Sequence, residues 1–240
     1  MNSVLNISAY RFVAIADPRA LREDLLDKAR ALGLKGTILL ATEGINLFLA
    51  GAPDALRGFV SALQLEGKES WSATQPFARL LVKVKREIIR MDHPAIQPAQ
   101  GRAPALDAAT ARRWLAQGRD DDGRPVVALD TRNAFEVNYG TFEGALDWRL
   151  RKFSDFPRAL EAHKHELDGK TVISFCTGGI RCEKAAIYMR EAGLDSVWQL
   201  EGGILKYFEE TGGAHFRGRC FVFDEREALD KDLKSAAPAA

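Results

Sequence analysis

The stretch that decides the fold reads FCTGGIRCEKA and spans residues 175–185. It begins at the end of an apolar run, Thr171–Phe175, of the kind that a parallel strand buried on both faces shows, and it leads into a helical pattern. Ligands of open parallel sheets bind beyond the carboxyl ends of the strands. A loop that ends at a helix N-terminus directs backbone N–H groups and the positive end of the helix dipole inward. The sequence therefore predicts an anion-binding loop at the edge of a sheet.

Cys176 stands at the head of this loop and is the candidate nucleophile. Gly178 and Gly179 permit a left-handed or crowded backbone, and Arg181 adds positive potential. A thiol in such a setting ionises more readily than in water, and the thiolate is the reactive form. The alternative is a small buried residue at a strand end, but the glycines and the arginine favour the catalytic interpretation.

The length of the loop bears on the reaction class. Cysteine phosphatases have one residue more between their cysteine and arginine than this chain has between Cys176 and Arg181. The shorter loop encloses a smaller ring of backbone, which suits a single sulfur or a persulfide better than a tetrahedral phosphate. Phosphatase activity is therefore disfavoured. The predicted active-site loop consists of Cys176, Thr177, Gly178, Gly179, Ile180, Arg181 and Cys182.

The two other cysteines have plainer interpretations. Cys182 either packs at the start of the helix or resolves an oxidised Cys176 as a disulfide, and we favour packing. Cys220 lies in an apolar run and is expected in the core. A Cys-x5-Cys pair without a nearby histidine is poor zinc spacing, so no metal site is predicted. No flavin or haem motif is visible, so no cofactor is predicted either.

Residues 105–225 alternate between apolar strands and helices, which predicts a parallel-sheet α/β domain with helices on both faces. The expected strands are Val126–Leu129, Thr171–Phe175 and Ser196–Leu200, and the expected helices follow the cap Asp107 and span Lys184–Ala192 and Ile204–Glu210.

Residues 1–90 predict the order strand, helix, strand, strand, helix, strand, which is that of a ferredoxin-like (acylphosphatase-like) βαββαβ domain. The expected elements are a strand at Val4–Val13, a helix from Asp17 to Gly33, a hairpin of Lys35–Thr42 and Ile45–Ala50, a helix at Asp54–Leu65 and a strand at Arg79–Ile89. The proline-containing residues 91–104 are expected to be a linker, and residues 226–240 a flexible C-terminal tail.

Composition limits the class of protein. Of 240 residues, 46% are apolar and 28% are charged, as in globular proteins, and no apolar run approaches the roughly 20 residues of a membrane helix. The first ten residues predict no secretory signal, and three cysteines predict no disulfide scaffold, so we expect a cytoplasmic protein. The net charge is only +1, with 13 basic and 9 acidic residues before position 91, which is weak evidence for a polyanionic partner.

Several motifs resemble those of known families. LDTR (129–132), FEGA (142–145), the Cys176 loop and LEGGI (200–204) resemble a rhodanese domain. LKGTILLATEGIN (34–46) together with CTGGIRCEKA (176–185) resembles the bacterial rhodanese-containing family of oxygen-dependent tRNA uridine hydroxylases. The resemblance implies 5-hydroxylation of the wobble uridine of tRNA, with molecular oxygen as co-substrate and Cys176 as the reactive, persulfide-forming residue.

The implied partner is a tRNA anticodon stem-loop, and the sequence identifies neither the reductant nor a sulfur donor. We expect the Cys176 thiolate to add to C6 of the uridine, which makes C5 electron-rich enough to react with oxygen. The alternative is a sulfurtransferase that carries sulfane sulfur as a Cys176 persulfide, and a third class is a non-enzymatic persulfide carrier or RNA-binding adaptor.

Candidates for RNA contact are few. Lys83, Lys85 and Arg86 lie on one predicted strand and could bind phosphates, although a solvated strand face is the commoner arrangement. Trp148, beside Arg149 and Arg151, is a candidate for stacking on a flipped base. Asp130 and Arg132, near the loop mouth, are expected to form a structural ion pair rather than to act in catalysis.

Overall fold

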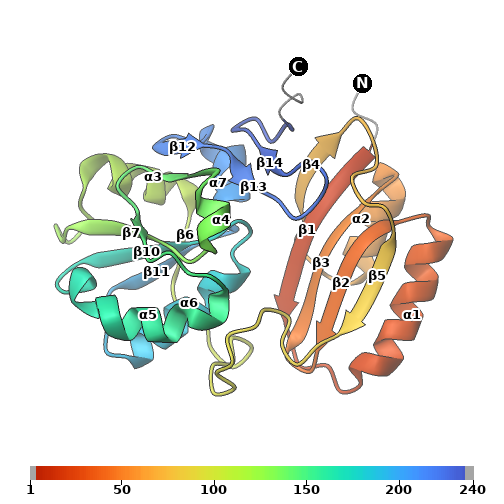
Figure 1. The fold of residues 1–240 in the computed structure, drawn as a ribbon, viewed down its shortest axis with the longest axis horizontal. Helices are drawn as coiled ribbons and strands as arrows, with labels where there is room; N and C mark the ends of the chain where they lie inside the picture. The colour runs from red at the N-terminus through yellow and green to blue at the C-terminus, as the bar shows by residue number, and fades with distance from the viewer. Residues whose placement is uncertain (1–3, 236–240) are drawn as a thin grey trace. The chain divides into compact units, whose positions relative to one another are not determined.

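A computed structural model describes residues 4–235, which form two units, each with its own five-stranded sheet (Figure 1). The first unit holds the described chain up to Arg90 together with 222–227 and 233–235, and the second holds Met91–Phe221 and Ala228–Asp232. Within residues 4–235, no helix is both long enough and apolar enough to span a bilayer.

The sheet of the first unit has the strand order β4-β1-β3-β2-β5. Its neighbours are antiparallel except β2 and β5, which are parallel. The elements are β1 (Val4–Phe12), α1 (Pro18–Ala31), β2 (Lys35–Ala41), β3 (Gly44–Gly51), α2 (Pro53–Ala62), β4 (Lys68–Ser72) and β5 (Leu80–Val84). The predicted cap is confirmed, because the Asp17 carboxylate accepts hydrogen bonds from the N–H groups of Arg19 and Ala20.

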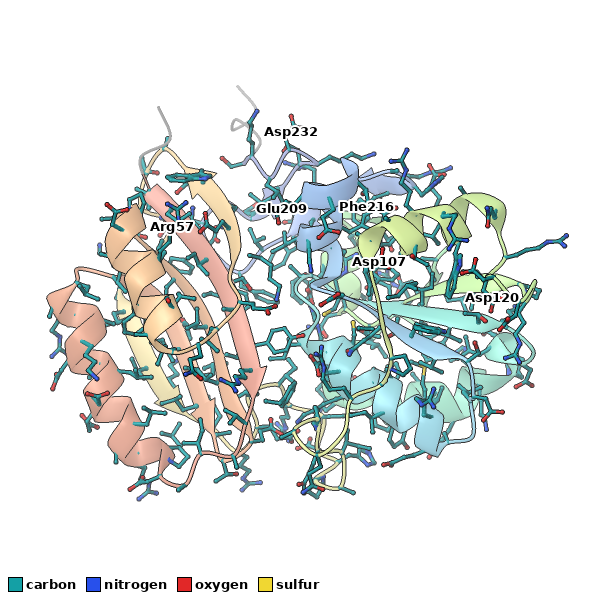
Figure 2. The ribbon with its side chains drawn as sticks, turned by 180° about the vertical axis from the view of Figure 1, so that it is seen from behind. Arg57, Asp107, Asp120, Glu209, Phe216 and Asp232 are labelled. Carbon is teal, nitrogen blue, oxygen red and sulfur yellow. The ribbon has the colours of Figure 1, made fainter. Side chains whose placement is uncertain are left out.

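The predicted last strand of the βαββαβ unit, Arg79–Ile89, is wrong. The strand that pairs with β1 is Lys68–Ser72, whereas Leu80–Val84 is an additional edge strand beside β2. Lys68–Ser72 buries polar Ser70 and Ser72 and so lacks the apolar alternation that marks a strand. Arg57 of α2, labelled in Figure 2, forms two hydrogen bonds of 2.8 and 2.7 Å to Glu69 of β4.

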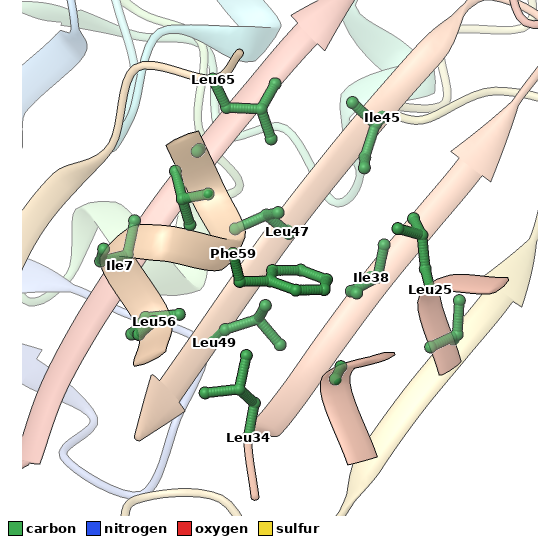
Figure 3. Close-up of a cluster of buried hydrophobic side chains, with 14 of the residues drawn as sticks. Ile7, Leu25, Leu34, Ile38, Ile45, Leu47, Leu49, Leu56, Phe59 and Leu65 are labelled. Atoms are coloured by element: carbon green, nitrogen blue, oxygen red, sulfur yellow. The ribbon is translucent and has the colours of Figure 1, made fainter. Parts of the chain in front are cut away.

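Both helices of this unit contribute to its hydrophobic core (Figure 3). Leu25 of α1 and Phe59 of α2 belong to the same buried cluster as Ile45, Leu47 and Leu49, which alternate along β3 and therefore point to one face of the sheet. Burial of each such side chain stabilises the fold by about 1.5–3 kcal/mol.

The TEGIN motif (42–46) forms hydrogen bonds with the backbone of Ile88, in the segment that follows β5. The Glu43 carboxylate accepts a hydrogen bond of 2.7 Å from the Ile88 N–H, and the Asn46 amide donates one of 3.2 Å to the Ile88 carbonyl. A side chain at Gly44 would place its Cβ 2.2 Å from the Arg11 carbonyl oxygen, which explains the glycine. The motif therefore has a structural role in the first unit.

The second unit contains the predicted parallel sheet, in the order β6-β11-β10-β7-β9, with every neighbouring pair parallel. Helices α3 and α7 lie on one side of it and α5 and α6 on the other (Figure 1). The strands are β6 (Ala105–Leu106), β7 (Val126–Asp130), β8 (Gly140–Phe142), β9 (Leu146–Asp147), β10 (Thr171–Phe175), β11 (Val197–Leu200), β12 (Phe216–Gly218), β13 (Cys220–Phe221) and β14 (Ala228–Leu229). The α-helices are α3 (Ala108–Gln117), α4 (Ala134–Val137), α5 (Phe156–His163), α6 (Ile180–Glu191) and α7 (Gly203–Thr211), and short 3-10 turns span Phe153–Asp155 and Lys164–Leu167.

Asp107 caps α3 as predicted, with its carboxylate 2.9 Å from the Thr110 nitrogen (Figure 2). By contrast, α6 begins at Ile180 and not at Lys184. The predicted start was late because Arg181, Glu183 and Lys184 resemble a polar loop in sequence, yet all three are buried here.

The connecting segments are more ordered than their composition suggests. Residues 91–104 contain no helix or strand, but Met91, Ile96 and Ala103 are buried. The predicted flexible tail is wrong for the described residues 226–235, because β14 pairs with β13 and its two residues, Ala228 and Leu229, are buried. Residues 236–240 of that prediction lie outside the described chain.

Leu47→Ala should lower the free energy of unfolding by about 2–5 kcal/mol, because Leu47 is fully buried in the first core and its removal leaves a cavity. Leu32→Ala, at an exposed position after α1, is the matched control and should change stability by less than about 0.5 kcal/mol. Urea unfolding measures both variants. Equal effects would contradict this core assignment.

Candidate active site

The loop between β10 and α6 places Cys176 directly after the strand and Gly179 at the helix N-cap. Gly179 has the left-handed φ of 98°, which glycine adopts without strain. Its N–H donates a hydrogen bond of 3.1 Å to the Cys176 sulfur. The Cys176 side chain is fully buried, so the sulfur lies inside the loop and not on its surface.

The surroundings of the sulfur favour the thiolate. Burial alone raises the pKa of Cys176, but a hydrogen bond from the Cys182 thiol, the positive charge of Arg181 and the backbone N–H groups of Arg181 and Cys182 outweigh it. Together they lower the pKa of Cys176 to about 5. Cys176 is therefore an anion at neutral pH, the form required of a nucleophile.

Cys182 is the neutral partner of this thiolate. Burial, together with the hydrogen bond to Cys176 and its charge, raises the pKa of Cys182 well above its ordinary value. The Thr131 hydroxyl lies 3.7 Å from the Cys182 sulfur and donates its own hydrogen bond to the Phe175 carbonyl. All three cysteines are free thiols in this structure. Cys182 is fully buried, and the choice between packing and resolving an oxidised Cys176 stays a prediction.

Cys220 is buried as predicted, and burial raises its pKa to about 12.

Glu136 of α4 holds Arg181 in place and is the residue that sequence reasoning missed. Its two carboxylate oxygens accept hydrogen bonds of 2.6 and 2.7 Å from the Arg181 guanidinium. Both side chains are buried, and Glu136 also accepts a hydrogen bond from the Asn133 N–H. The spacing from Asn133 to Glu136 is that of a capping box, which signals a helix start but not a contact with the loop.

Asp130 and Arg132 form the predicted structural ion pair. The Arg132 guanidinium donates a hydrogen bond of 2.6 Å to the Asp130 carboxylate, and both side chains are fully buried. Arg132 also donates to the Gly140 carbonyl, and the Thr141 hydroxyl donates to Asp130. The pair therefore ties the end of β7 to β8.

The LEGGI motif (200–204) leads into α7, and the first turn of this helix hydrogen-bonds to the backbone of the Cys176 loop. The N–H groups of Ile204 and Leu205, at the start of α7, donate to the carbonyls of Cys176 and Thr177 at 2.9 and 3.1 Å. Gly203 has φ of 67°, and a Cβ there would lie 2.5 Å from the Cys176 carbonyl oxygen. The motif therefore requires a glycine at this position because the helix start contacts the loop backbone directly.

The predicted RNA contacts fall into two separate groups. In the first unit, Lys83, Lys85 and Arg86 are exposed, but only Lys83 lies within β5. In the second unit, Trp148, Arg149 and Arg151 follow β9, and both arginines are exposed.

Trp148 already has partners within the second unit. Its ring stacks on His163 with centroids 5.5 Å apart, and its N–H donates to Glu166. Arg149 donates to Asn138 and Asp147. RNA binding by all six predicted residues stays a prediction.

No metal centre accompanies these features in the part of the chain that the structure describes, because no three His, Cys, Asp or Glu side chains are grouped to hold an ion.

Comparison with known proteins covers nearly the whole chain. Residues 4–88 match the UPF0176 acylphosphatase like domain, and residues 111–210 match the rhodanese-like domain. A curated protein of Variovorax paradoxus named tRNA uridine(34) hydroxylase is 66% identical over all of this chain and 94% of its own length. Proteins with the same name from Bordetella pertussis (66% identical, 99% of this chain, 100% of that one) and Delftia acidovorans (62%, 97% and 91%) match similarly.

Arg181→Gln combined with Glu136→Gln should raise the pKa of Cys176 above about 5, because the positive charge of Arg181 is lost. The double variant avoids the buried unpaired carboxylate that Arg181→Gln alone would leave, which costs about 3–5 kcal/mol. Ultraviolet absorbance of the thiolate, as a difference from Cys176→Ser, follows the titration. Arg113→Gln, which removes an exposed arginine paired with Asp121, is the control. An unchanged titration in the double variant would contradict the role of Arg181.

Gly203→Ala should destabilise the fold more than Gly212→Ala. Both glycines have nearly the same positive φ, 67° and 64°, so the backbone strain is matched. Only the Cβ at position 203 meets other atoms, whereas the Cβ at 212 has none within 4 Å. Thermal unfolding of both variants measures the fall in melting temperature, and the difference between the two falls reports the steric clash at position 203. Equal falls would show that α7 does not contact the loop as closely as described.

Proposed function

We propose that this chain, which belongs to the tRNA uridine(34) hydroxylase family, hydroxylates C5 of uridine 34 with molecular oxygen and uses Cys176 as its nucleophile. It is a two-domain enzyme, with an acylphosphatase-like domain followed by a rhodanese-like domain. The observation that carries the proposed mechanism is the buried Cys176 sulfur, which accepts a hydrogen bond from the Gly179 N–H in a loop whose Arg181 is fixed by Glu136.

The Cys176 thiolate activates the uracil ring for reaction with oxygen. C5 of uracil reacts poorly with oxygen, but addition of the Cys176 sulfur to C6 places negative charge on C5 and O4. C5 then bonds one atom of molecular oxygen, and an external two-electron reductant together with three protons cleaves the O–O bond, which leaves a hydroxyl on C5 and releases the other atom as water. Loss of the C5 proton and of the sulfur restores the C5–C6 double bond and frees Cys176.

The loop residues supply positive potential during these steps. Arg181 is fixed by Glu136 and contributes its charge at a distance, while the loop N–H groups and the N-terminus of α6 are preorganised around the sulfur. Donors that already surround the sulfur need not be assembled during the reaction, which lowers the barrier to addition.

The substrate must present an unstacked base, because a ring inside a stack cannot reach a buried sulfur. The loop of an anticodon stem-loop meets this requirement, since its bases are single-stranded and can be splayed out. Because the substrate is a tRNA, we expect the reaction in the cytoplasm. The exposed lysines and arginines near β5 and β9 are candidates for phosphate contacts.

A stem-loop with 5-fluorouridine at position 34 should form a covalent adduct with the wild-type chain, because fluorine at C5 replaces the proton whose loss would release the sulfur. Cys176→Ala should form none. Cys220→Ala, which removes a buried cysteine whose pKa is raised to about 12, is the control and should still form the adduct. Mass spectrometry of the protein detects it. Equal trapping by wild type and Cys176→Ala would reject the addition step.

Nucleosides from a deletion strain distinguish the reaction classes. Loss of 5-hydroxyuridine derivatives, restored by wild type and not by Cys176→Ala, is the expected result. Loss of thiolated nucleosides, with thiosulfate:cyanide turnover in vitro, would instead indicate a sulfurtransferase that carries a Cys176 persulfide. Loss of neither would indicate an adaptor.

A further inference from the structure

Arg149 is an exposed arginine at the edge of the sheet that carries the Cys176 loop. β9 ends at Asp147, which is in register with Asp130 of β7, and Asp130 is in register with Phe175 of β10. Neighbouring strands lie about 4.8 Å apart, so the backbone at Asp147 lies roughly 10 Å from that at Phe175. Arg149 is two residues beyond this row, and Cys176 is one residue beyond it. Arg149 therefore lies at the same edge of the sheet as the nucleophile.

The guanidinium of Arg149 is held through one of its nitrogens. Nη1 donates hydrogen bonds of 3.0 Å to the Asn138 amide oxygen and 2.9 Å to the Asp147 carboxylate. The other oxygen of that carboxylate accepts a hydrogen bond of 2.8 Å from the Arg149 N–H, where the backbone has the left-handed φ of 53° that is uncommon for arginine. The side chain is nevertheless 58% exposed. The guanidinium is therefore fixed in direction and open to solvent.

The segment that contains Arg149 is also tied to the active site through α4. The Ala134 N–H at the start of this helix donates a hydrogen bond of 2.7 Å to the Leu150 carbonyl. The same helix carries Glu136, whose carboxylate fixes Arg181 of the active-site loop. One short helix therefore positions both the loop arginine and the segment that carries Arg149.

The remaining donors of Arg149 suit one class of ligand. Within residues 4–235, which the structure describes, neither Nε nor Nη2 of this side chain has a hydrogen-bond partner. These two nitrogens form the edge of a guanidinium that binds two oxygens of a phosphate or a carboxylate at once. An RNA strand presents a phosphate at every nucleotide, whereas its bases are uncharged. A backbone phosphate near the base that enters the loop therefore matches these donors.

Resting on the proposed function, we propose that Arg149 binds a phosphate beside uridine 34 through Nε and Nη2, with Asp147 and Asn138 holding the guanidinium in direction. A phosphate contact positions the stem-loop without reading its sequence. Because Arg149 and Cys176 share one edge of the sheet, the same nucleotide places its phosphate on Arg149 and its base toward Cys176. Arg149 thus determines the affinity and placement of the substrate, and Cys176 its reactivity.

Neutral replacement of single phosphates tests this assignment. Wild type and Arg149→Gln are compared on a natural stem-loop and on two others, which carry a methylphosphonate on the 5′ or on the 3′ side of uridine 34. Wild type should bind one of the two modified stem-loops about 5- to 30-fold more weakly than the natural one at low salt. Arg149→Gln should weaken binding of the natural stem-loop by the same factor. It should not weaken binding of that modified stem-loop further, because the contact is already lost.

The salt dependence of binding adds a readout that a merely structural role would not move. In Arg149→Gln, the slope of log affinity against log salt concentration should become less steep by about 0.7, as expected for one lost phosphate contact to a single strand. Arg149→Lys keeps the charge but not the paired donors, so it should restore the slope and only part of the affinity. Arg113→Gln is the matched control, because this exposed arginine also pairs with an aspartate, Asp121, but in the turn that precedes β7. It should change neither quantity.

The contrary results are specific. Equal weakening of all three stem-loops by Arg149→Gln would overturn the contact beside uridine 34. A wild-type affinity that neither methylphosphonate changes would overturn it without any variant. Thermal unfolding of Arg149→Gln, at an exposed position, checks that the fold is retained. If the natural stem-loop binds through Arg149 but wild type forms no 5-fluorouridine adduct, the proposed function fails and the phosphate contact does not.

Discussion

A buried negative charge on Cys176 is the constraint on which the active site depends. An isolated thiolate in a protein interior is strongly unfavourable, so its charge must be balanced nearby. Arg181 and the loop N–H groups stabilise the thiolate, and Glu136 fixes Arg181 with two hydrogen bonds. A second buried pair, Asp130 and Arg132, lies at the end of the neighbouring strand β7. Removal of one member of a pair would leave its partner buried and unpaired, so single substitutions at these positions should be strongly destabilising.

The parallel sheet explains why motifs far apart in sequence act together. Strands β7, β10 and β11 are neighbours and run in the same direction, so their carboxyl ends share one edge. The LDTR, CTGGIRC and LEGGI motifs are the segments that follow or end these strands. The TEGIN motif of the first unit accepts a hydrogen bond from the Ile88 N–H and donates one to the Ile88 carbonyl.

The parts of the structure that could be predicted are those determined locally. Cys176, Gly179 and Arg181 lie within a few residues of one another, so the strand, the loop and the helix start indicated their arrangement. Glu136 could not be found in this way, because its contact with Arg181 spans 45 residues. Buried polar residues explain two further errors of prediction. Ser70 and Ser72 interrupt the apolar alternation of β4, so the sequence does not indicate a strand there. Buried Glu183 and Lys184 resemble a polar loop, so the sequence predicts too late a start for α6.

The pH dependence of covalent trapping tests the central claim most directly. Under single turnover with a 5-fluorouridine stem-loop, the rate of adduct formation should be level from neutral pH upward and fall only as the pH approaches about 5, where the Cys176 thiolate takes up a proton. Below the pKa it should decrease about tenfold per pH unit, as expected for one titrating group. A rate that instead rises through pH 8 to 9, roughly as an ordinary thiol ionises, would contradict the account.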